Sequence, residues 1–376
     1  MNAIRPPLNR ILFLATELRP GGAEKCLVNL ACGIDRGRFQ PLVVSLRSSP
    51  ALHESRLCKQ LDQHGVPTYF LECDSKLQFW KGVKRLRNII REQNVSIVQS
   101  FLYHANVVAG IALRHENQVR FFSGIRVAEP NWIRHKIEKL ATRHAERMIC
   151  VSERVKQHAF ATMRFPKEKL TAIPNSVETP QVNSKFNLED YGITSPFVVF
   201  VGRLEKQKGL LPFMSFIKKQ TETLPDFEIV FVGEGSERSA LQRIANQLDR
   251  KVHFTGWVDQ PQDFIARAEL VFLPSLWEGM PNTLLETMAL GKPFLAFGVD
   301  GIGELNQGST RIDPRQIITP GNYSLFLQHM AQLINEHPLS AQIGQQNQKQ
   351  ADSHFSTQKM IAAYEGIYLG NSISLD

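Results

Sequence analysis

The stretch LVFLPSLWEGMPNTLLETMALGKPFLAFG, residues 270–298, decides the expected fold of this chain. It opens with a continuous apolar run at 270–274 and closes with a second one at 293–297. Between the two runs, Asn282 or Thr283 is a suitable helix start, with Pro281 expected in the first turn, and Gly291 is a suitable helix end. Two buried strands joined by one helix are typical of a parallel sheet that helices cover on both faces.

The same alternation of apolar runs and helix-like stretches extends along the whole chain. It predicts an α/β fold with doubly wound parallel sheets. The predicted strands are 11–16, 42–46, 69–73, 96–101, 119–125, 147–152, 197–202, 227–233, 252–257, 270–274 and 293–297. The predicted helices include 23–34, 79–92, 131–147, 210–219 and 237–248.

The alternation breaks between Pro174 and Pro196, where the sequence is rich in Pro, Asn and Ser. We interpret this segment as a linker between two doubly wound domains, one over residues 1–180 and one that begins at residue 181. In such sheets, ligands bind in the crevice outside the carboxyl ends of the strands. The residues that follow the predicted strands are therefore the candidates for function.

Composition and charge restrict the class of protein. The chain has 376 residues, of which 43% are hydrophobic and 21% charged, and these values exclude a disordered chain. No apolar run approaches the roughly 18 residues of a membrane-spanning helix. Five cysteines form no CxxC pair, which predicts free thiols in a reducing cytoplasm.

The net charge of +8 is unevenly distributed. Residues 1–180 carry 28 Lys and Arg against 15 Asp and Glu, whereas residues 181–376 carry 16 against 21. A basic first half indicates that this half meets a polyanion. An anionic membrane surface, a phosphorylated acceptor and a nucleic acid all satisfy that description.

Two carboxylates flank the helix start in the 270–298 stretch. Glu278 precedes the helix and can point into the crevice, while Glu286 projects from its second or third turn. The main-chain N–H groups of residues 279–283 would form a positive helix terminus suited to a phosphate. Carboxylates beside an anion site indicate hydrogen bonds to sugar hydroxyls. The alternative is a turn glutamate and a solvated helix glutamate.

Two further strand exits carry candidate phosphate-binding groups. FVVFVGRLEKQKGL, residues 197–210, places Arg203 and Lys208 just after a strand, where a guanidinium and an ammonium could bind a phosphate. After the first strand, Gly21 and Gly22 let the main chain approach a ligand at another helix terminus. The alternatives are a basic surface turn and a plain strand-to-helix turn.

The sequence offers few other candidates for catalytic or metal-binding residues. His104 follows the fourth strand on the ligand side of the sheet, and Glu304 follows a glycine-flanked turn. No His/Cys cluster has zinc spacing and no DxD-like pair stands at a strand end, so no metal is expected. GxSxG and GxxxxGK[ST] motifs are also absent from the sequence.

Taken together, these segments resemble the retaining glycosyltransferases of family 4, which have the GT-B fold. The likeness covers nearly the whole chain, in the family's order, and its most specific part is the last block. It rests on PGGAEK at 20–25, YHAN at 103–106, IPNS at 173–176, VGRLEKQKG at 201–209, FVGEG at 231–235 and EGMPNTLLETMALGKP at 278–293.

The resemblance implies two Rossmann-like domains that face each other across a cleft. The N-terminal domain, 1–180, would bind the acceptor, and the C-terminal domain, 181–356, would bind a nucleotide-sugar. The final segment, 357–376, looks like the helix that crosses back to the first domain in this fold. A hexosyltransferase of this kind needs no cofactor or metal, because the nucleotide-sugar is a co-substrate.

The resemblance also assigns roles to residues. Arg203 and Lys208 would bind the donor diphosphate and stabilise the leaving group, and Gly21 and Gly22 would approach the same phosphates. His104 would lie near the anomeric centre. The transferred sugar would be bound by Glu278, the ribose by Glu286, and the rest of the donor site would be lined by Gly279, Met280, Pro281, Asn282 and Thr283.

The implied reaction moves a sugar from a nucleotide-sugar to a lipid-linked or saccharide acceptor. A UDP-sugar is favoured over GDP-mannose, and the expected pathway is the synthesis of a cell-surface polysaccharide such as lipopolysaccharide. Breaking the glycosyl–phosphate bond requires stabilisation of negative charge on the diphosphate. Cationic side chains and helix termini could supply it.

The basic helix predicted at 79–92, FWKGVKRLRNIIRE, offers a way to reach a lipid-linked acceptor. Trp80, Val83, Leu86 and Ile90 recur at helical spacing among lysines and arginines, a pattern that can lie on anionic lipid. The alternative is an ordinary amphipathic helix packed on the sheet. We hypothesise a cytoplasmic enzyme bound peripherally to the inner face of the cytoplasmic membrane.

Two other functions share parts of this pattern. Nucleotide-sugar epimerases have the same architecture but need acids placed for elimination chemistry, which the 278–293 block does not favour. A non-catalytic protein, either a degenerate scaffold or a basic binding protein, is the third reading. No platform of interleaved aromatic and basic residues stands out, so nucleic acid is not an expected partner.

Overall fold

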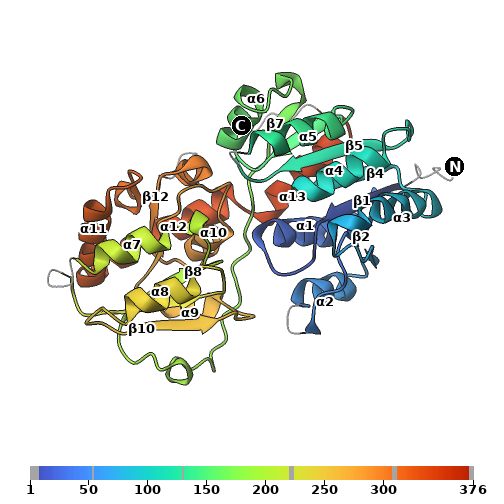
Figure 1. The fold of residues 1–376 in the computed structure, drawn as a ribbon. Helices are drawn as coiled ribbons and strands as arrows, with labels where there is room; N and C mark the ends of the chain where they lie inside the picture. Colours follow the sequence, from blue (N-terminus) through green and yellow to red (C-terminus); the bar gives the residue numbers. More distant parts are fainter. Residues whose placement is uncertain (1–7, 53–54, 129–130, 220–223, 307–310, 372–376) are drawn as a thin grey trace. The chain divides into compact units, whose positions relative to one another are not determined.

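The computed structural model describes residues 8–52, 55–128, 131–219, 224–306 and 311–371. The chain divides into two compact units (Figure 1). Unit 1 contains the chain up to Asn175 together with the segment that begins at Thr357, and unit 2 contains Ser176–Ser356. The first crossing between the units therefore lies at 175/176, a few residues before the boundary at 180 that the sequence predicts.

Unit 1 is built on a parallel sheet of seven strands in the order β3-β2-β1-β4-β5-β6-β7. From β1 the chain adds β2 and β3 on one side and then returns to add β4 on the other, so the winding reverses between β1 and β4. The strands are β1 (Asn9–Ala15), β2 (Phe39–Ser45), β3 (Thr68–Phe70), β4 (Ile97–Phe101), β5 (Arg120–Ile125), β6 (Arg147–Cys150) and β7 (Leu170–Ala172).

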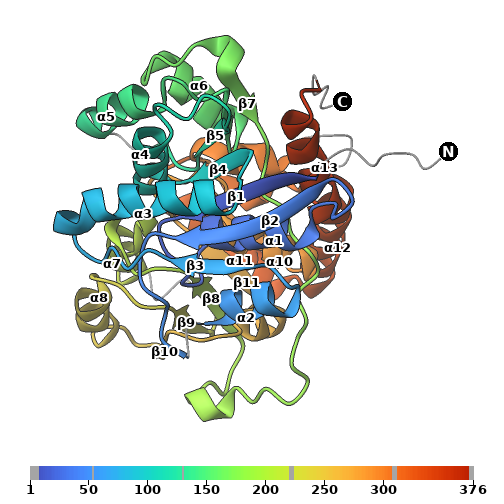
Figure 2. The same ribbon diagram turned by 90° about the vertical axis from the view of Figure 1, so that its right-hand side faces the viewer.

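Helices cover both faces of this sheet. On one face α4 packs against both α3 and α5, and on the other α1 packs against α2 and α13 (Figure 2). The last of these, α13, is the C-terminal helix of the described chain. The helices are α1 (Gly22–Gly33), α2 (Arg56–Gln63), α3 (Phe79–Glu92), α4 (Tyr103–Ala112), α5 (Trp132–Thr142), α6 (Glu153–Ala161) and α13 (Thr357–Tyr368).

Unit 2 repeats this plan with a parallel sheet of six strands, β10-β9-β8-β11-β12-β13, whose winding reverses between β8 and β11. Its strands are β8 (Phe197–Val201), β9 (Glu228–Val232), β10 (Val252–Gly256), β11 (Leu270–Leu273), β12 (Phe294–Phe297) and β13 (Ile317–Ile318). Its helices are α7 (Leu210–Ile217), α8 (Arg238–Ala245), α9 (Gln262–Arg267), α10 (Asn282–Ala289), α11 (Tyr323–Asn335) and α12 (His337–His354).

The predicted α/β class with two doubly wound parallel sheets is confirmed. Each of the eleven predicted strands is present, with ends that differ by a few residues at most. Strands β7 and β13 are not predicted from the sequence, because three and two residues are too few to show a pattern. All five cysteines are free.

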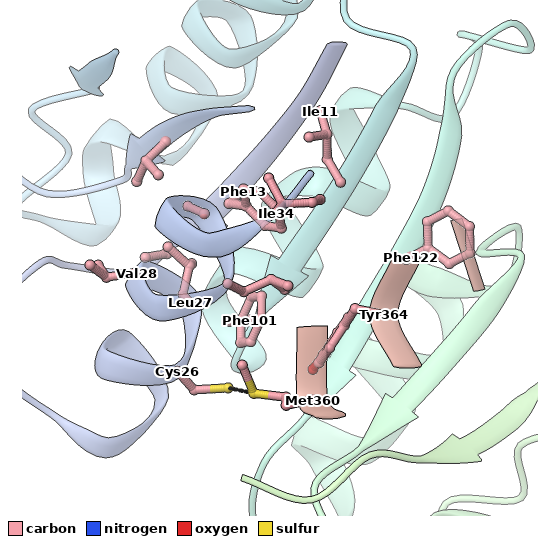
Figure 3. Packing of buried hydrophobic residues seen from close by; sticks show 14 of the residues in the cluster. Ile11, Phe13, Cys26, Leu27, Val28, Ile34, Phe101, Phe122, Met360 and Tyr364 are labelled. Atoms are coloured by element: carbon pink, nitrogen blue, oxygen red, sulfur yellow. Dashed lines mark hydrogen bonds between the residues drawn. The ribbon is translucent and has the colours of Figure 1, made fainter. Parts of the chain in front are cut away.

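The core of unit 1 joins the first and last parts of the chain. Apolar residues of β1 and α1 pack with Met360, Tyr364, Ile367 and Tyr368 of α13. Figure 3 shows Met360 beside Cys26, whose thiol donates to the Met360 sulfur at 3.4 Å, and Tyr364 near Phe101. Residues more than 300 positions apart thus share one hydrophobic cluster, which fixes α13 to unit 1.

Helix α3 has the bounds that the sequence predicts, but its apolar stripe is not available to lipid. Val83, Leu86 and Ile90 are buried within unit 1, and only Trp80 of the four is exposed. Its three arginines are also engaged, since Arg85 pairs with Glu72 and both Arg87 and Arg91 pair with Glu116. The expectation that this stripe lies on a membrane is therefore wrong, and the alternative of a helix packed on the sheet holds.

Tyr368 provides a test of the role of α13. Its ring is 1% exposed and contacts Phe122, and its hydroxyl donates to Gln99 at 3.1 Å. We expect Tyr368→Ala to lower the free energy of unfolding by about 3–5 kcal/mol, because it opens a cavity in the core. Urea unfolding followed by circular dichroism measures this. The adjacent, more exposed Leu369 serves as the control, and equal losses in Tyr368→Ala and Leu369→Ala would contradict the packing described.

Glu228, at the start of β9, is a buried carboxylate with three partners. Burial acts to raise its pKa, but hydrogen bonds from Lys251, His253 and the Thr194 amide outweigh burial and hold the pKa below its ordinary value. A lowered pKa stabilises the fold above the usual pKa of glutamate, about 4.3, and this contribution disappears as pH falls through the folded-state value.

We therefore expect Glu228→Gln to destabilise unit 2 by about 1–3 kcal/mol at pH 7, and the difference from the parent protein to shrink in acid. Urea titrations at pH 7 and at progressively lower pH measure both effects. Glu178→Gln, at an exposed position of the same unit, should change little at any pH. A constant gap between Glu228→Gln and the parent across this range would show that the charge of Glu228 is not the source of its effect.

Candidate functional site

The winding of unit 2 reverses between β8 and β11, which lie side by side with Leu270 opposite Val198. Since the strands are parallel, the loops that follow them emerge at the same edge of the sheet. At such a reversal the two loops diverge and leave room for a ligand. The loop after β8 carries Arg203 and Lys208, and the loop after β11 carries Glu278.

Lys208 and Glu278 form a buried ion pair between these loops. The Lys208 ammonium donates to Oε1 of Glu278, and the Ser275 hydroxyl donates to the same oxygen at 2.7 Å. Their side chains are only 15% and 7% exposed. A buried carboxylate is costly unless it is paired and hydrogen-bonded, and here it is both. The sequence predicts a separate ligand contact for each of the two residues and does not predict that they touch.

Hydrogen bonds to main-chain carbonyls hold the two loops together. The Leu276 amide donates to the Gln207 carbonyl at 2.8 Å, and the Gln207 side-chain amide donates to the Trp277 carbonyl at 2.9 Å. Gly209 has φ +63°, and a Cβ at this position would lie 2.2 Å from the Pro274 carbonyl oxygen. Only glycine fits this approach, and it places Lys208 next to the loop after β11.

Asp300, which follows β12, supports Glu278 from a third loop. Its carboxylate accepts a hydrogen bond from the main-chain amide of Glu278 at 3.0 Å. Asp300 opens the 3-10 segment Asp300–Asn306, which also contains the half-buried Glu304. Asp300 and Ser275 are not among the site residues that the sequence predicts. The position of Asp300 directly after a parallel strand was the signal that could have identified it.

Helix α10 begins beside this pair. Its first residue is Asn282, and Pro281 occupies the preceding cap position instead of the first turn that the sequence predicts. Gly279 and Met280 are buried on the approach to the helix. The first amides of a helix lack intrahelical acceptors and carry partial positive charge, so the edge that holds Glu278 also presents anion-binding groups. The Thr283 hydroxyl is engaged, since it donates to the Val201 carbonyl at 3.2 Å.

Glu286 and Arg203 lie at the margins of this group. Glu286 is half-buried in the second turn of α10, as the sequence predicts. Arg203 is exposed just after β8. Its loop is fastened to the loop after β9, because Glu205 accepts hydrogen bonds from the Ser236 hydroxyl at 2.7 Å and the Ser236 amide at 3.0 Å. These bonds hold the pKa of Glu205 below its ordinary value, so it remains an acceptor at neutral pH.

Unit 1 has the same kind of edge where its winding reverses between β1 and β4. The turn after β1 ends at Gly21, which caps α1, and Gly22 is the first helical residue. Gly21 has φ −146°, an extended conformation that any residue adopts. No special backbone angle therefore requires glycine at position 21.

His104 lies after β4 at this edge of unit 1. It is exposed in the first turn of α4, with its ring 5.2 Å from that of Tyr103. Leu102, just before the helix, has φ +70°, which is uncommon for a residue with a branched side chain. The turn is held by the main-chain amide of Asn106, which donates to the Leu102 carbonyl at 2.9 Å. Among the residues that the structure describes, no three His, Cys, Asp or Glu side chains form a group that could hold a metal ion.

In unit 2 the structure thus gathers a guanidinium, a paired ammonium and carboxylate, a second carboxylate and a helix N-terminus at one sheet edge. Such a set can bind an anion next to hydroxyl groups. Gly21, Gly22 and His104 belong to the corresponding edge of unit 1.

Comparison with protein-family models matches both units. Residues 20–181 match the model described as Glycosyltransferase Family 4, and residues 195–336 match the model described as Glycosyl transferases group 1. The two matched regions contain all of the site residues described above.

Individual relatives are distant. The chain is 24% identical over 247 residues to the UDP-Gal:alpha-D-GlcNAc-diphosphoundecaprenol alpha-1,3-galactosyltransferase of Escherichia coli, covering 60% of this chain and 64% of that protein. It is 25% identical over 186 residues to a glycosyltransferase of Methanocaldococcus jannaschii and covers 43% of it. These matches span less than two thirds of either relative.

Similarity in fold covers more of this chain than similarity in sequence does. The crystal structure of HepE from Anabaena, in complex with UDP and glucose, superposes with a TM-score of 0.80 at 20% identity, over 96% of this chain and 100% of that one. With two family models that together span most of the sequence and this shared architecture, the chain belongs to the group 1, family 4 glycosyltransferases and has the GT-B fold.

Proposed function

We propose that this protein transfers a sugar from a nucleotide-sugar to a lipid-linked or saccharide acceptor in the synthesis of a cell-surface polysaccharide. A UDP-sugar is the favoured donor, with GDP-mannose as the alternative. The observation that carries the proposal is the Lys208–Glu278 pair at the winding reversal of unit 2, beside the start of α10.

In this proposal the donor diphosphate binds at the edge of unit 2. Arg203 and Lys208 offset its charge, and the first amides of α10 add oriented dipoles. These groups matter most as the glycosyl–phosphate bond breaks, because negative charge then develops on the leaving phosphate. Glu278 and Glu286 accept hydrogen bonds from the hydroxyls of the transferred sugar and of the ribose. The backbone at residues 279–283 lines the donor site.

Lys208 has a double role in this arrangement. Before the donor binds, Glu278 neutralises the ammonium and keeps it in place within a buried environment. A diphosphate that arrives would share the ammonium with the carboxylate. The pair thus links phosphate binding to the position of the carboxylate that receives the sugar.

We assign the acceptor to unit 1. Gly21 and Gly22 contribute main-chain groups to phosphate binding, and His104 acts near the anomeric centre. The excess of basic residues in the first half of the chain is consistent with an acceptor that carries phosphate or lies at an anionic membrane. No helix in the part of the chain that the structure describes is long and apolar enough to cross a bilayer. We propose a cytoplasmic location with peripheral binding to the inner membrane face.

The distant relatives support this choice of substrates. The name of the E. coli relative specifies a UDP-sugar donor and a diphosphoundecaprenol acceptor. HepE has also been crystallised with UDP-glucose. Another relative, from Rhizobium meliloti, is named a lipopolysaccharide core biosynthesis glycosyltransferase.

Arg203 tests the donor site without disturbing the buried pair. We expect Arg203→Ala to weaken the binding of the true nucleotide-sugar about 10- to 100-fold, which corresponds to about 1.5–3 kcal/mol for a lost charged hydrogen bond. Calorimetric titration with UDP-, GDP- and ADP-sugars identifies the donor and measures the loss.

Lys206→Ala is the matched control, since Lys206 is an exposed cation in the same loop. Equal effects of the two substitutions would indicate a nonspecific charge effect and not a site. Incubation of the parent protein with UDP-N-acetylglucosamine alone tests the epimerase alternative. Formation of an epimer without any acceptor would favour that class over a transferase.

Glu278→Gln separates the two roles of the buried pair. Glutamine keeps the shape and can still accept from Ser275, but it no longer neutralises Lys208. We expect the affinity for free UDP to be unchanged or higher, and sugar transfer to fall by at least about tenfold. Calorimetry with UDP and a radiolabelled transfer assay measure the two effects. Loss of UDP binding with normal transfer would refute these roles, and Glu336→Gln, at an exposed position of unit 2, controls for the change of charge.

A further inference from the structure

Helix α5 turns its polar side chains inward and its apolar side chains outward. His135, Glu138 and Thr142 are buried in unit 1. The large apolar residues of the helix are exposed by 44–68%: Trp132 63%, Ile133 52%, Ile137 44% and Leu140 68%. Burial of apolar surface drives folding. An apolar helix face that stays exposed therefore indicates a surface that binds a partner or a membrane.

The inward face is fastened by specific contacts, so the helix cannot rotate to hide its apolar side. Asn106 of α4 donates to the Glu138 carboxylate at 2.6 Å and to the Gly124 carbonyl at 2.9 Å. The His135 ring packs edge-on against that of His158 at 5.2 Å. A rotation that buried Leu140 would have to break this polar network and leave its groups without partners.

The exposed apolar residues form one continuous face. At about 100° per residue, Trp132, Ile133, Ile137 and Leu140 fall within an arc of about 140°. Lys136 and Arg143 lie within the same arc, and Lys139 lies at its border. The Lys136 ammonium stands 4.6 Å from the centre of the Trp132 ring.

The charge of this face has one sign. The single acidic residue of α5, Glu138, is buried with Asn106, so the outward side presents only cations among its charged groups. A helix with an exposed apolar face, flanking lysines and a tryptophan has the features of one that lies in the interface of an anionic bilayer. The centre of a protein–protein interface is instead depleted of charged residues and of lysine in particular, whereas Lys136 stands beside Trp132 within this face.

The position of α5 connects this face to the candidate site of unit 1. The Arg134 guanidinium lies 5.0 Å from the centre of the Tyr103 ring, and the Tyr103 ring contacts His104. The start of α5 and the start of α4 therefore meet at the edge of the sheet where His104 lies.

We propose that the outward face of α5 docks unit 1 on an anionic lipid surface. Trp132, Ile133, Ile137 and Leu140 enter the headgroup region, and Lys136, Lys139 and Arg143 contact lipid phosphates. Docking by α5 places the His104 edge next to the membrane, where the headgroup of a lipid-linked acceptor is found. This consequence rests on the proposed function, whereas the docking itself does not.

Sedimentation with lipid vesicles tests the proposal. The full chain is mixed with vesicles of phosphatidylglycerol and phosphatidylcholine, or of phosphatidylcholine alone, at low and high salt. We expect binding to the anionic vesicles only, weakened by salt. Absence of binding to the anionic vesicles at low salt would overturn the proposal.

Matched substitutions identify the helix responsible. Trp132→Ser and the double variant Ile137→Ser/Leu140→Ser should each weaken vesicle binding at least about tenfold. Trp80→Ser removes a tryptophan of similar exposure, 70%, from α3 and should leave binding unchanged. A loss in Trp80→Ser but not in Trp132→Ser would move the surface to α3 and refute the role of α5.

Two further measurements separate the possible failures. Analytical ultracentrifugation of the parent and the double variant detects a second copy on this face. If the double variant abolishes self-association but leaves vesicle binding unchanged, lipid docking through α5 is contradicted. Calorimetric binding of the nucleotide-sugar should be the same in all these variants. If vesicles bind through α5 but no nucleotide-sugar binds, the docking stands and the proposed function fails.

Discussion

The buried contact between the Lys208 ammonium and the Glu278 carboxylate is the interaction on which the site of unit 2 depends. Each charge offsets the desolvation cost that the other would carry if it were held alone in this largely buried position. The pair forms only because β8 and β11 are neighbours, which brings together two loops that are 70 residues apart. Ser275, Asp300 and Gly209 then hold the loops in the one arrangement that keeps the pair intact.

The same winding rule places the candidate residues of unit 1. Its sheet reverses between β1 and β4, and the turn at Gly21 and Gly22 and the His104 turn follow these two strands. The chemistry of the two edges differs. Unit 2 offers fixed charges suited to a diphosphate and sugar hydroxyls, whereas unit 1 offers a two-glycine turn, an exposed imidazole and a neighbouring apolar, basic helix. This division is consistent with our proposal that unit 2 binds the donor and unit 1 the acceptor.

The sequence predicted the strands and the residues at their ends well, because buried parallel strands leave an apolar run followed by an abrupt polar turn. It could not predict contacts that depend on strand order, such as Lys208 with Glu278 or Asp300 with the Glu278 amide. Periodicity also fails to say which face of a helix is buried. In α3 the apolar stripe packs inward, whereas in α5 Glu138 and His135 face inward and Leu140 faces out, since buried polar partners decide the orientation.

The most direct test of the central claim is a crystal structure of the protein with a bound UDP-sugar. The account predicts the diphosphate within hydrogen-bond distance of the Lys208 ammonium and the Arg203 guanidinium, with its phosphates facing the first amides of α10. The sugar hydroxyls should contact Glu278. A nucleotide-sugar bound at any other edge of the sheets, with the Lys208–Glu278 pair untouched, would contradict the account.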